Sequence, residues 1–318
     1  MKLIVALCLL FTGFLPVFAQ KDTNINYRTL IGVNGNMLFT SKNEYSVSNQ
    51  IKILRKSKIG SYRFKLPLDD NGFVTDAQVL ESFFSTLNKI NVIAIPQIDV
   101  STSNERFLPE YYSNNFKRGR NFCYNYGNYL NTIELGYNCD RESMISDSLD
   151  GSEQSHYNQT KTQQIMAALS GFIDGVHSLD TSIRVAIAVS DRHYFFLEFL
   201  NMFKVNYNII ALHFNDPEVD LNTNSYNLWN DLQFIKNRYN KSLWLTGFSY
   251  PGDELRGKFQ ENSYTLSTNT LKKLVVDGII DRLFIDNNFK KSTYSNLPSI
   301  FSKKNLLKQN IDFALTIR

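Results

Sequence analysis

The chain has 318 residues, of which 43% are hydrophobic and 20% are charged. This balance excludes a disordered or collagen-like chain and predicts a folded protein with one large core or two smaller ones. The 34 basic and 30 acidic residues leave a net charge of +4 without long runs of one sign, so no nucleic-acid partner is predicted, because such a surface needs clustered Lys and Arg.

The first nineteen residues have the pattern of a secretory signal peptide. They read MKLIVALCLLFTGFLPVFA, with one Lys before an apolar run and a small residue, Ala19, before Gln20. This order of charge, apolar stretch and small residue is typical of a cleaved leader. No later apolar stretch is long enough to span a bilayer. We therefore expect a signal peptide over 1–19 and an exported protein, periplasmic, cell-surface or extracellular, without a transmembrane segment.

Two cysteines, Cys123 and Cys139, remain after removal of this leader. In an oxidising compartment they either form one disulfide, whose loop of about 15 residues would contribute about 3 kcal/mol, or stay two separate buried thiols. The histidines are far apart along the chain: His156, His177, His193 and His213. Without the Cys and His spacing of a metal site, the sequence predicts neither a metal nor a cofactor.

Short apolar, β-branched runs recur along the chain and predict eight β-strands. In chain order they are LIGVNG (30–35), SYRFKL (61–66), VIAIPQI (92–98), TIELGY (132–137), IRVAIAV (183–189), IIALHF (209–214), LWLTGF (243–248) and RLFID (282–286).

Between the runs lie segments whose apolar residues recur every three or four positions, as in amphipathic helices. They are SVSNQIKILRKSK (46–58), DAQVLESFFSTLNKI (76–90), KTQQIMAALSGFIDGVHSL (161–179), SYNLWNDLQFIK (225–236) and NTLKKLVVDGI (269–279). The alternation of strands and helices predicts an α/β fold, a (β/α)8 TIM barrel. An open doubly wound sheet fits less well, because GVNGN (32–36) lacks the third glycine of a dinucleotide-binding turn.

No linker, low-complexity tract or internal repeat divides the chain. We therefore expect a single barrel domain over 20–318. The longest stretches without a predicted element, about 100–120 and 138–160, flank the strand at 132–137. As loops they would lie over the C-terminal mouth of the barrel, where barrel proteins bind their ligands.

Five stretches in order resemble the clan A glycoside hydrolases, the retaining (β/α)8 glycosidases, in the style of families 39 and 79. They are GVNGN, SYRFKL, INVIAIPQI, TIELG and SLWLTGFSY, and the resemblance covers most of residues 30–286. The resemblance implies a sugar-binding mouth in which Arg63, at the end of the second strand, supports the site.

The same resemblance implies that both catalytic positions are substituted. A retaining glycosidase needs two carboxyl groups about 5–5.5 Å apart, a proton donor and a nucleophile. The matching positions hold Asn138 after the fourth strand and Gly247 on the seventh, and Tyr137 stands where a sugar-contacting Asn is expected. An amide does not act as an acid near neutral pH, and glycine offers no nucleophile. This pattern predicts a pseudoenzyme, a barrel without a catalytic residue at either position.

Other acids lie near these positions. Glu134 shares the inward direction of Asn138 but lies about 13 Å deeper in the barrel, so we expect a buried carboxylate paired with Arg63 or Lys65. Asp140 and Glu254 follow the fourth and seventh strands and are the fallback acids for an active enzyme.

Candidate ligand-binding residues follow the strand ends: Arg63, Tyr137, Asn138, His213, Asn215 and Asn287. Trp244 is expected to point outward and pack beneath a helix, because its direction alternates with that of Gly247. The leading hypothesis is an exported, inactive glycosidase-like barrel that binds a glycan or a partner protein at its mouth. The alternatives are an active glycosidase with relocated carboxylates and a structural or interaction protein without a sugar role.

Overall fold

The computed structural model describes residues 31–35, 47–57, 60–102, 107–190, 192–213, 228–249, 279 and 281–286. The predicted signal peptide and nearly all of the helix predicted over 269–279 lie outside these ranges. So do three of the candidate site residues, Asn215, Glu254 and Asn287.

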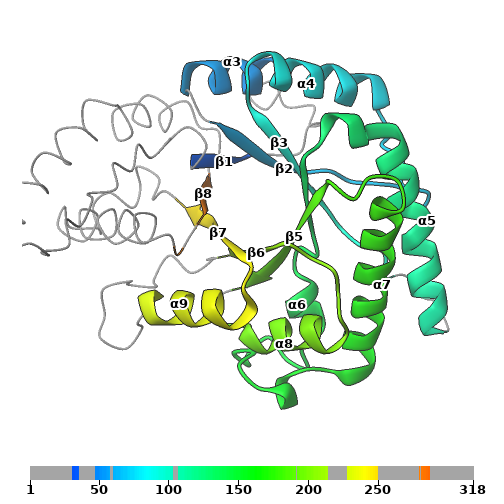
Figure 1. Ribbon diagram of the computed structural model, residues 1–318, viewed down its shortest axis with the longest axis vertical. Helices are drawn as coiled ribbons and strands as arrows, with labels where there is room; N and C mark the ends of the chain where they lie inside the picture. The colour runs from blue at the N-terminus through cyan, green and yellow to red at the C-terminus, as the bar shows by residue number, and fades with distance from the viewer. Residues whose placement is uncertain are drawn as a thin grey trace, which may run out of the picture.

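The eight strands are all parallel and close into a barrel in chain order, as the sequence predicts (Figure 1). Each strand pairs with the next, and β1 closes the barrel by pairing with β8, with Val33 opposite Ile285. The strands are β1 Ile31–Gly35, β2 Ser61–Lys65, β3 Ile93–Ile98, β4 Thr132–Leu135, β5 Arg184–Ser190, β6 Ile209–His213, β7 Ser242–Ser249 and β8 Arg282–Asp286.

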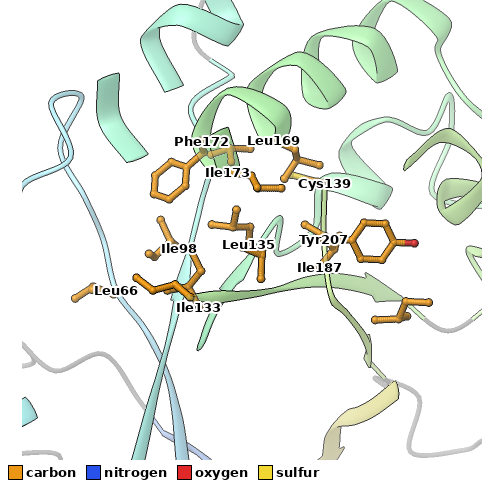
Figure 2. Close-up of a cluster of buried hydrophobic side chains, with 14 of the residues drawn as sticks. Leu66, Ile98, Ile133, Leu135, Cys139, Leu169, Phe172, Ile173, Ile187 and Tyr207 are labelled. Carbon is orange, nitrogen blue, oxygen red and sulfur yellow. The ribbon is translucent and has the colours of Figure 1, made fainter. Parts of the chain in front are cut away.

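The described helices cover part of the outside of the barrel (Figure 1). They are α3 Val47–Ser57, α4 Ala77–Lys89, α5 Leu108–Tyr126, α6 Cys139–Glu142, α7 Gln159–His177, α8 Tyr194–Met202 and α9 Leu228–Tyr239, with short 3-10 turns at Gly127–Tyr129 and Gln154–His156. Outward side chains of the strands, such as Leu135 and Ile187, pack with Leu169 and Ile173 of α7 in the main core (Figure 2). In the part of the chain that the structure describes, no helix is long and apolar enough to cross a bilayer.

The barrel interior contains a second, smaller apolar cluster. Trp244 of β7 and Phe284 of β8 lie with their ring centroids 5.4 Å apart. Ala186 and Ala211 belong to the same cluster, and their small side chains leave room for the two rings. The cluster therefore fills the interior between β5 and β8.

The prediction that Trp244 packs beneath a helix is wrong. Its side chain is 2% exposed inside the barrel, not under the outer helix layer. The prediction assumes strict alternation of side-chain direction between Trp244 and Gly247. This assumption fails because the register of β7 against β8 shifts between Leu245 and Phe248. A bulge adds a residue and reverses the inward and outward directions beyond it. Residues before and after the bulge therefore cannot be related by simple alternation.

The prediction of an irregular segment over 100–120 is also wrong, because α5 occupies most of it. The helix begins at Leu108, and the Glu110 side chain accepts from the Phe107 amide at 3.1 Å, which caps the first turn. Polar residues stand on its buried face: Arg118 donates to three backbone carbonyls, those of Leu68, Asp69 and Asp99, at 2.7–2.9 Å. Buried polar side chains of this kind hide the apolar period of a helix.

Candidate functional site at the barrel mouth

The aromatic ring of Tyr137 lies across the C-terminal mouth of the barrel. Lys65 at the end of β2 places its Nζ 5.6 Å from the centre of this ring. The ring of His213 at the end of β6 lies 5.5 Å away, at 84° to it. β2 and β6 are four strand positions apart in an eight-stranded barrel and so lie on opposite sides. Tyr137 therefore bridges the opening between them.

A sharp turn after β4 positions this ring. The strand ends at Leu135, and Gly136 and Asn138 both adopt left-handed conformations, with φ of 78° and 63°. Glycine and asparagine are the residues that enter this region at low cost. Asn138 then becomes the N-terminal cap residue of α6, although its side chain makes no capping hydrogen bond. The turn therefore places both Tyr137 and Asn138 at the mouth, partly exposed.

His213 is held from the neighbouring strand. Its side chain is mostly buried, and Nδ1 lies 3.2 Å from Oγ1 of Thr246. The Thr246 hydroxyl donates its only hydrogen to the Leu212 carbonyl at 3.0 Å, so it accepts from His213, whose Nδ1 carries a proton. This pair fixes the tautomer and the orientation of the imidazole toward Tyr137.

Beneath the mouth lies a buried ion pair between β2 and β4. Arg63 donates from Nε and Nη2 to the two carboxylate oxygens of Glu134, each at 2.5 Å, and from Nη1 to Oδ1 of Asn34 at 3.1 Å. Gln97 also donates to Glu134, at 3.4 Å. Arg63 is 4% exposed and Glu134 is fully buried. The predicted interior pairing of Glu134 is confirmed. The Arg63 guanidinium and the Glu134 carboxylate are bonded to each other below the level of Tyr137.

Lys65 and Asp99 form an ion pair at the rim. Nζ of Lys65 lies 3.2 Å from Oδ2 of Asp99, and both side chains are nearly half exposed. The other carboxylate oxygen, Oδ1, is buried without a hydrogen-bond partner. Sequence reasoning did not include Lys65 among the ligand-binding candidates. The sequence feature that could have identified Lys65 is its position two residues after Arg63. Side chains two apart on a strand share a direction, so Lys65 also points inward, nearer to the mouth.

Asp140, the first fallback acid, is buried rather than exposed at the rim. Its Oδ2 accepts from the Ser190 amide and from Nδ1 of His193, each at 2.7 Å. Burial by itself would raise the pKa of Asp140, but the hydrogen bonds and charge of His193, together with Ser190, bring the pKa below its usual value of 3.8. Asp140 is therefore an ionised carboxylate whose hydrogen bonds tie α6 to the segment after β5.

Gly247 lies in β7 at the register shift between Leu245 and Phe248. Thr246 pairs with His213 at this level of the barrel, and it supplies the hydroxyl that contacts the imidazole. The structure therefore places Arg63, Tyr137, Asn138 and His213 at or just below one opening. It does not describe Asn215, Asn287 or Glu254.

Two cavities lie away from the mouth. One of about 780 Å³ lies against α3 and α4 beside Val47 and Ile51, and one of about 300 Å³ lies at the N-terminal end of β3 beside Asn91 and Tyr129. Among the described residues, no three His, Cys, Asp or Glu side chains gather in a group that could hold a metal ion. The described part of the mouth thus presents one aromatic ring, one ion pair and the amide of Asn138.

Comparison with known proteins supports the fold but does not assign the chain to a family. No protein-family model matches the chain, and no curated protein matches it. Among solved structures, the GH53 catalytic domain of Ignisphaera aggregans is 12% identical, with a TM-score of 0.57, and the match covers 83% of this chain and 86% of that one. A β-glucosidase from Thermotoga maritima in complex with cyclophellitol is 10% identical, with a TM-score of 0.57, over 81% of this chain and 88% of that one. The chain therefore folds as a glycoside hydrolase-like (β/α)8 barrel.

Proposed function

We propose that this protein is an exported pseudo-glycosidase: a glycoside hydrolase-like barrel that binds a glycan or a partner protein at its mouth without cleaving it. The likeness of its motifs to families 39 and 79 supports this proposal, because it aligns Asn138 and Gly247 with the acid and the nucleophile of those enzymes. Neither residue can supply a carboxyl group.

The observation that carries the proposal is the position of Tyr137. A retaining glycosidase keeps open the space between its two carboxylates, since the sugar ring must enter there. Here that part of the mouth holds the Tyr137 ring between Lys65 and His213. A ring in this place would narrow the space in which a sugar ring could be cleaved and would offer its own face as a contact surface.

Two of the acids that the sequence offers as candidates near the mouth are already engaged. Glu134 is held by Arg63, and Asp140 is held by His193 and Ser190. A general acid needs a raised pKa and access to the leaving oxygen, whereas the pKa of Asp140 is lowered and its side chain is buried. These two carboxylates therefore serve the scaffold.

The rim supplies groups that suit a hydroxylated ligand. Lys65 provides a donor, Asp99 provides a half-exposed carboxylate, and Tyr137 provides an aromatic ring. Sugars bind through hydroxyl groups and through the C–H face that packs on aromatic rings. A protein loop with polar and apolar side chains would use the same groups.

The test combines hydrolysis and binding measurements on the purified chain. We expect no sugar release from a panel of aryl glycosides and polysaccharides, and binding on a glycan array that Tyr137→Ala weakens about tenfold, or 1.4 kcal/mol. Tyr124→Ala is the matched control, because Tyr124 is 79% exposed on the outer helix α5.

Other outcomes separate the alternatives. Hydrolysis that is lost in Asp140→Asn or Glu254→Gln and kept in Asn138→Ala would establish an active glycosidase. Absence of glycan binding, together with a protein that co-purifies and is released by Tyr137→Ala, would establish an interaction protein. Export is tested separately: we expect the secreted chain to begin at Gln20.

A further inference from the structure

Two arginines face the interior at the floor of the barrel, the end opposite the mouth. Arg184 begins β5 and Arg282 begins β8. Each stands two residues before a residue of the interior cluster, Ala186 or Phe284. Side chains two apart on a strand share a direction, so both arginines point toward the barrel axis at its N-terminal end.

The two guanidinium groups converge on β7. Nη2 of Arg184 donates to Oγ of Ser242 at 2.8 Å. Cζ of Arg282 lies 5.1 Å from the centre of the Trp244 ring. Ser242 and Trp244 are successive inward positions on that strand, about 7 Å apart. The two positive charges therefore share one small region of the floor, where their repulsion adds to burial in lowering the pKa of Arg282.

No acid in the described part of the chain is paired with either group. The nearest carboxylate, Asp281, attracts Arg282 only at longer range. Its Oδ2 instead accepts from Nζ of Lys236 at 3.1 Å and from the Leu243 amide at 2.9 Å. Arginine stays charged at any pH at which proteins fold. Arg282 is partly buried and Arg184 is exposed, so an anion bound between them would offset the desolvation of Arg282 and the repulsion between the two charges.

We propose that this floor is a binding site for a tetrahedral oxyanion, a phosphate or sulfate group. Two guanidinium groups offer several N–H donors in the forked geometry that such groups accept. Ser242 accepts from Arg184 and so keeps its own hydroxyl hydrogen to donate to the anion. The site is separate from the mouth and does not depend on the function proposed there.

The experiment compares sodium phosphate, sodium sulfate and sodium chloride at equal ionic strength, using thermal unfolding and calorimetric titration of the full chain. We expect phosphate or sulfate, but not chloride, to raise the unfolding midpoint progressively with concentration, because a ligand that binds only the folded state stabilises it. Arg282→Gln and Arg184→Gln should each weaken the anion affinity at least about tenfold. Equal midpoints in all three salts would overturn the proposal.

Arg238→Gln is the control, since Arg238 is an exposed arginine of α9 that is paired with Glu198. It should leave the anion-dependent increase unchanged, and loss of the increase in this variant would also overturn the proposal. If Arg282→Gln does not fold, the exposed Arg184 provides the deciding variant. A further titration with phenyl phosphate asks whether the site binds a free ion or a phosphate group carried on a larger molecule. Competition between phenyl phosphate and inorganic phosphate would indicate a carried group. Absence of competition would indicate the free ion.

Discussion

At the scale of single residues, two pairs of buried polar side chains join distant elements of this barrel. Arg63 and Glu134 join β2 to β4, and Asp140 and His193 join α6 to the segment after β5. Removing one partner from such a pair leaves a buried group without its hydrogen bonds, which costs more than the pair contributes when intact. Glu134 and Asp140 therefore act in the stability of the fold.

Asp140→Asn should destabilise the protein by about 2 kcal/mol near neutral pH. The pKa of Asp140 is lowered in the folded state, so its contribution to stability is present above the unfolded pKa of about 3.9 and is lost as the pH falls through the folded pKa. Urea unfolding at about pH 7 and about pH 3 should show the difference between wild type and variant shrinking in acid.

The neighbouring Glu142→Gln is the control for this measurement, because Glu142 is exposed on the same short helix. Its effect should stay within about 0.5 kcal/mol at both pH values. A difference for Asp140→Asn that is unchanged or larger in acid would contradict the interpretation.

At the scale of elements, the most extensive contact between described helices is that of α5 with α7, which run side by side on the outside of the barrel (Figure 1). Glycines allow this approach. A Cβ added to Gly175 would lie 2.1 Å from the Phe116 carbonyl oxygen, and one added to Gly171 would lie 2.1 Å from that of Tyr112. These neighbours are backbone atoms, so the two helices must separate before a larger residue fits.

Gly175→Ala should therefore destabilise the protein, against the trend of helix propensity. Alanine gains about 1 kcal/mol over glycine in a helix interior, but separating two packed helices costs about 1–3 kcal/mol or more. We expect a net loss of at least about 1 kcal/mol in urea unfolding. At Gly127 the added Cβ would meet only side-chain atoms, Sγ of Cys123 at 3.0 Å and Cδ1 of Ile183 at 3.6 Å, so Gly127→Ala should be nearly neutral. Equal stability of the two variants would show that the helices separate without cost.

At the scale of the whole molecule, the core holds together without a covalent cross-link among its described residues. Cys123 and Cys139 are both free and buried, which decides between the two alternatives left open by the sequence in favour of separate thiols. Burial raises the pKa of Cys123 to about 11, and that of Cys139 also lies well above its usual value because of burial. Such thiols are unreactive, because the thiolate is the reactive form.

Native protein should therefore resist alkylation by iodoacetamide, and both thiols should react after unfolding in denaturant. A reducing agent should leave the thermal unfolding midpoint unchanged, since no described disulfide contributes to stability. Mass spectrometry of the alkylated, unreduced chain checks this. A mass that lacks two thiol hydrogens, with a midpoint lowered by reduction, would show that the cysteines are bonded.

The elements of the barrel were predictable from the sequence, whereas the directions of some side chains were not. The alternation of strands and helices was predicted because each element has its own local period, two for strands and 3.6 for helices. Glu134 was placed correctly because no bulge lies between it and the end of β4. Trp244 was placed wrongly because a register shift separates it from Gly247, and α5 was missed because buried Asn115 and Arg118 interrupt its apolar face.

The sequence by itself determined the barrel, because hydrophobic periodicity along the chain decides which faces are buried. It also determined the residue types at the mouth, including the absence of carboxyl groups at Asn138 and Gly247. Only the tertiary structure decided that Tyr137 crosses the opening and that Asp140 is held by His193. It likewise brought Arg184 and Arg282 together at the floor. These contacts join residues tens of positions apart, and they depend on register and backbone turns that no local pattern records.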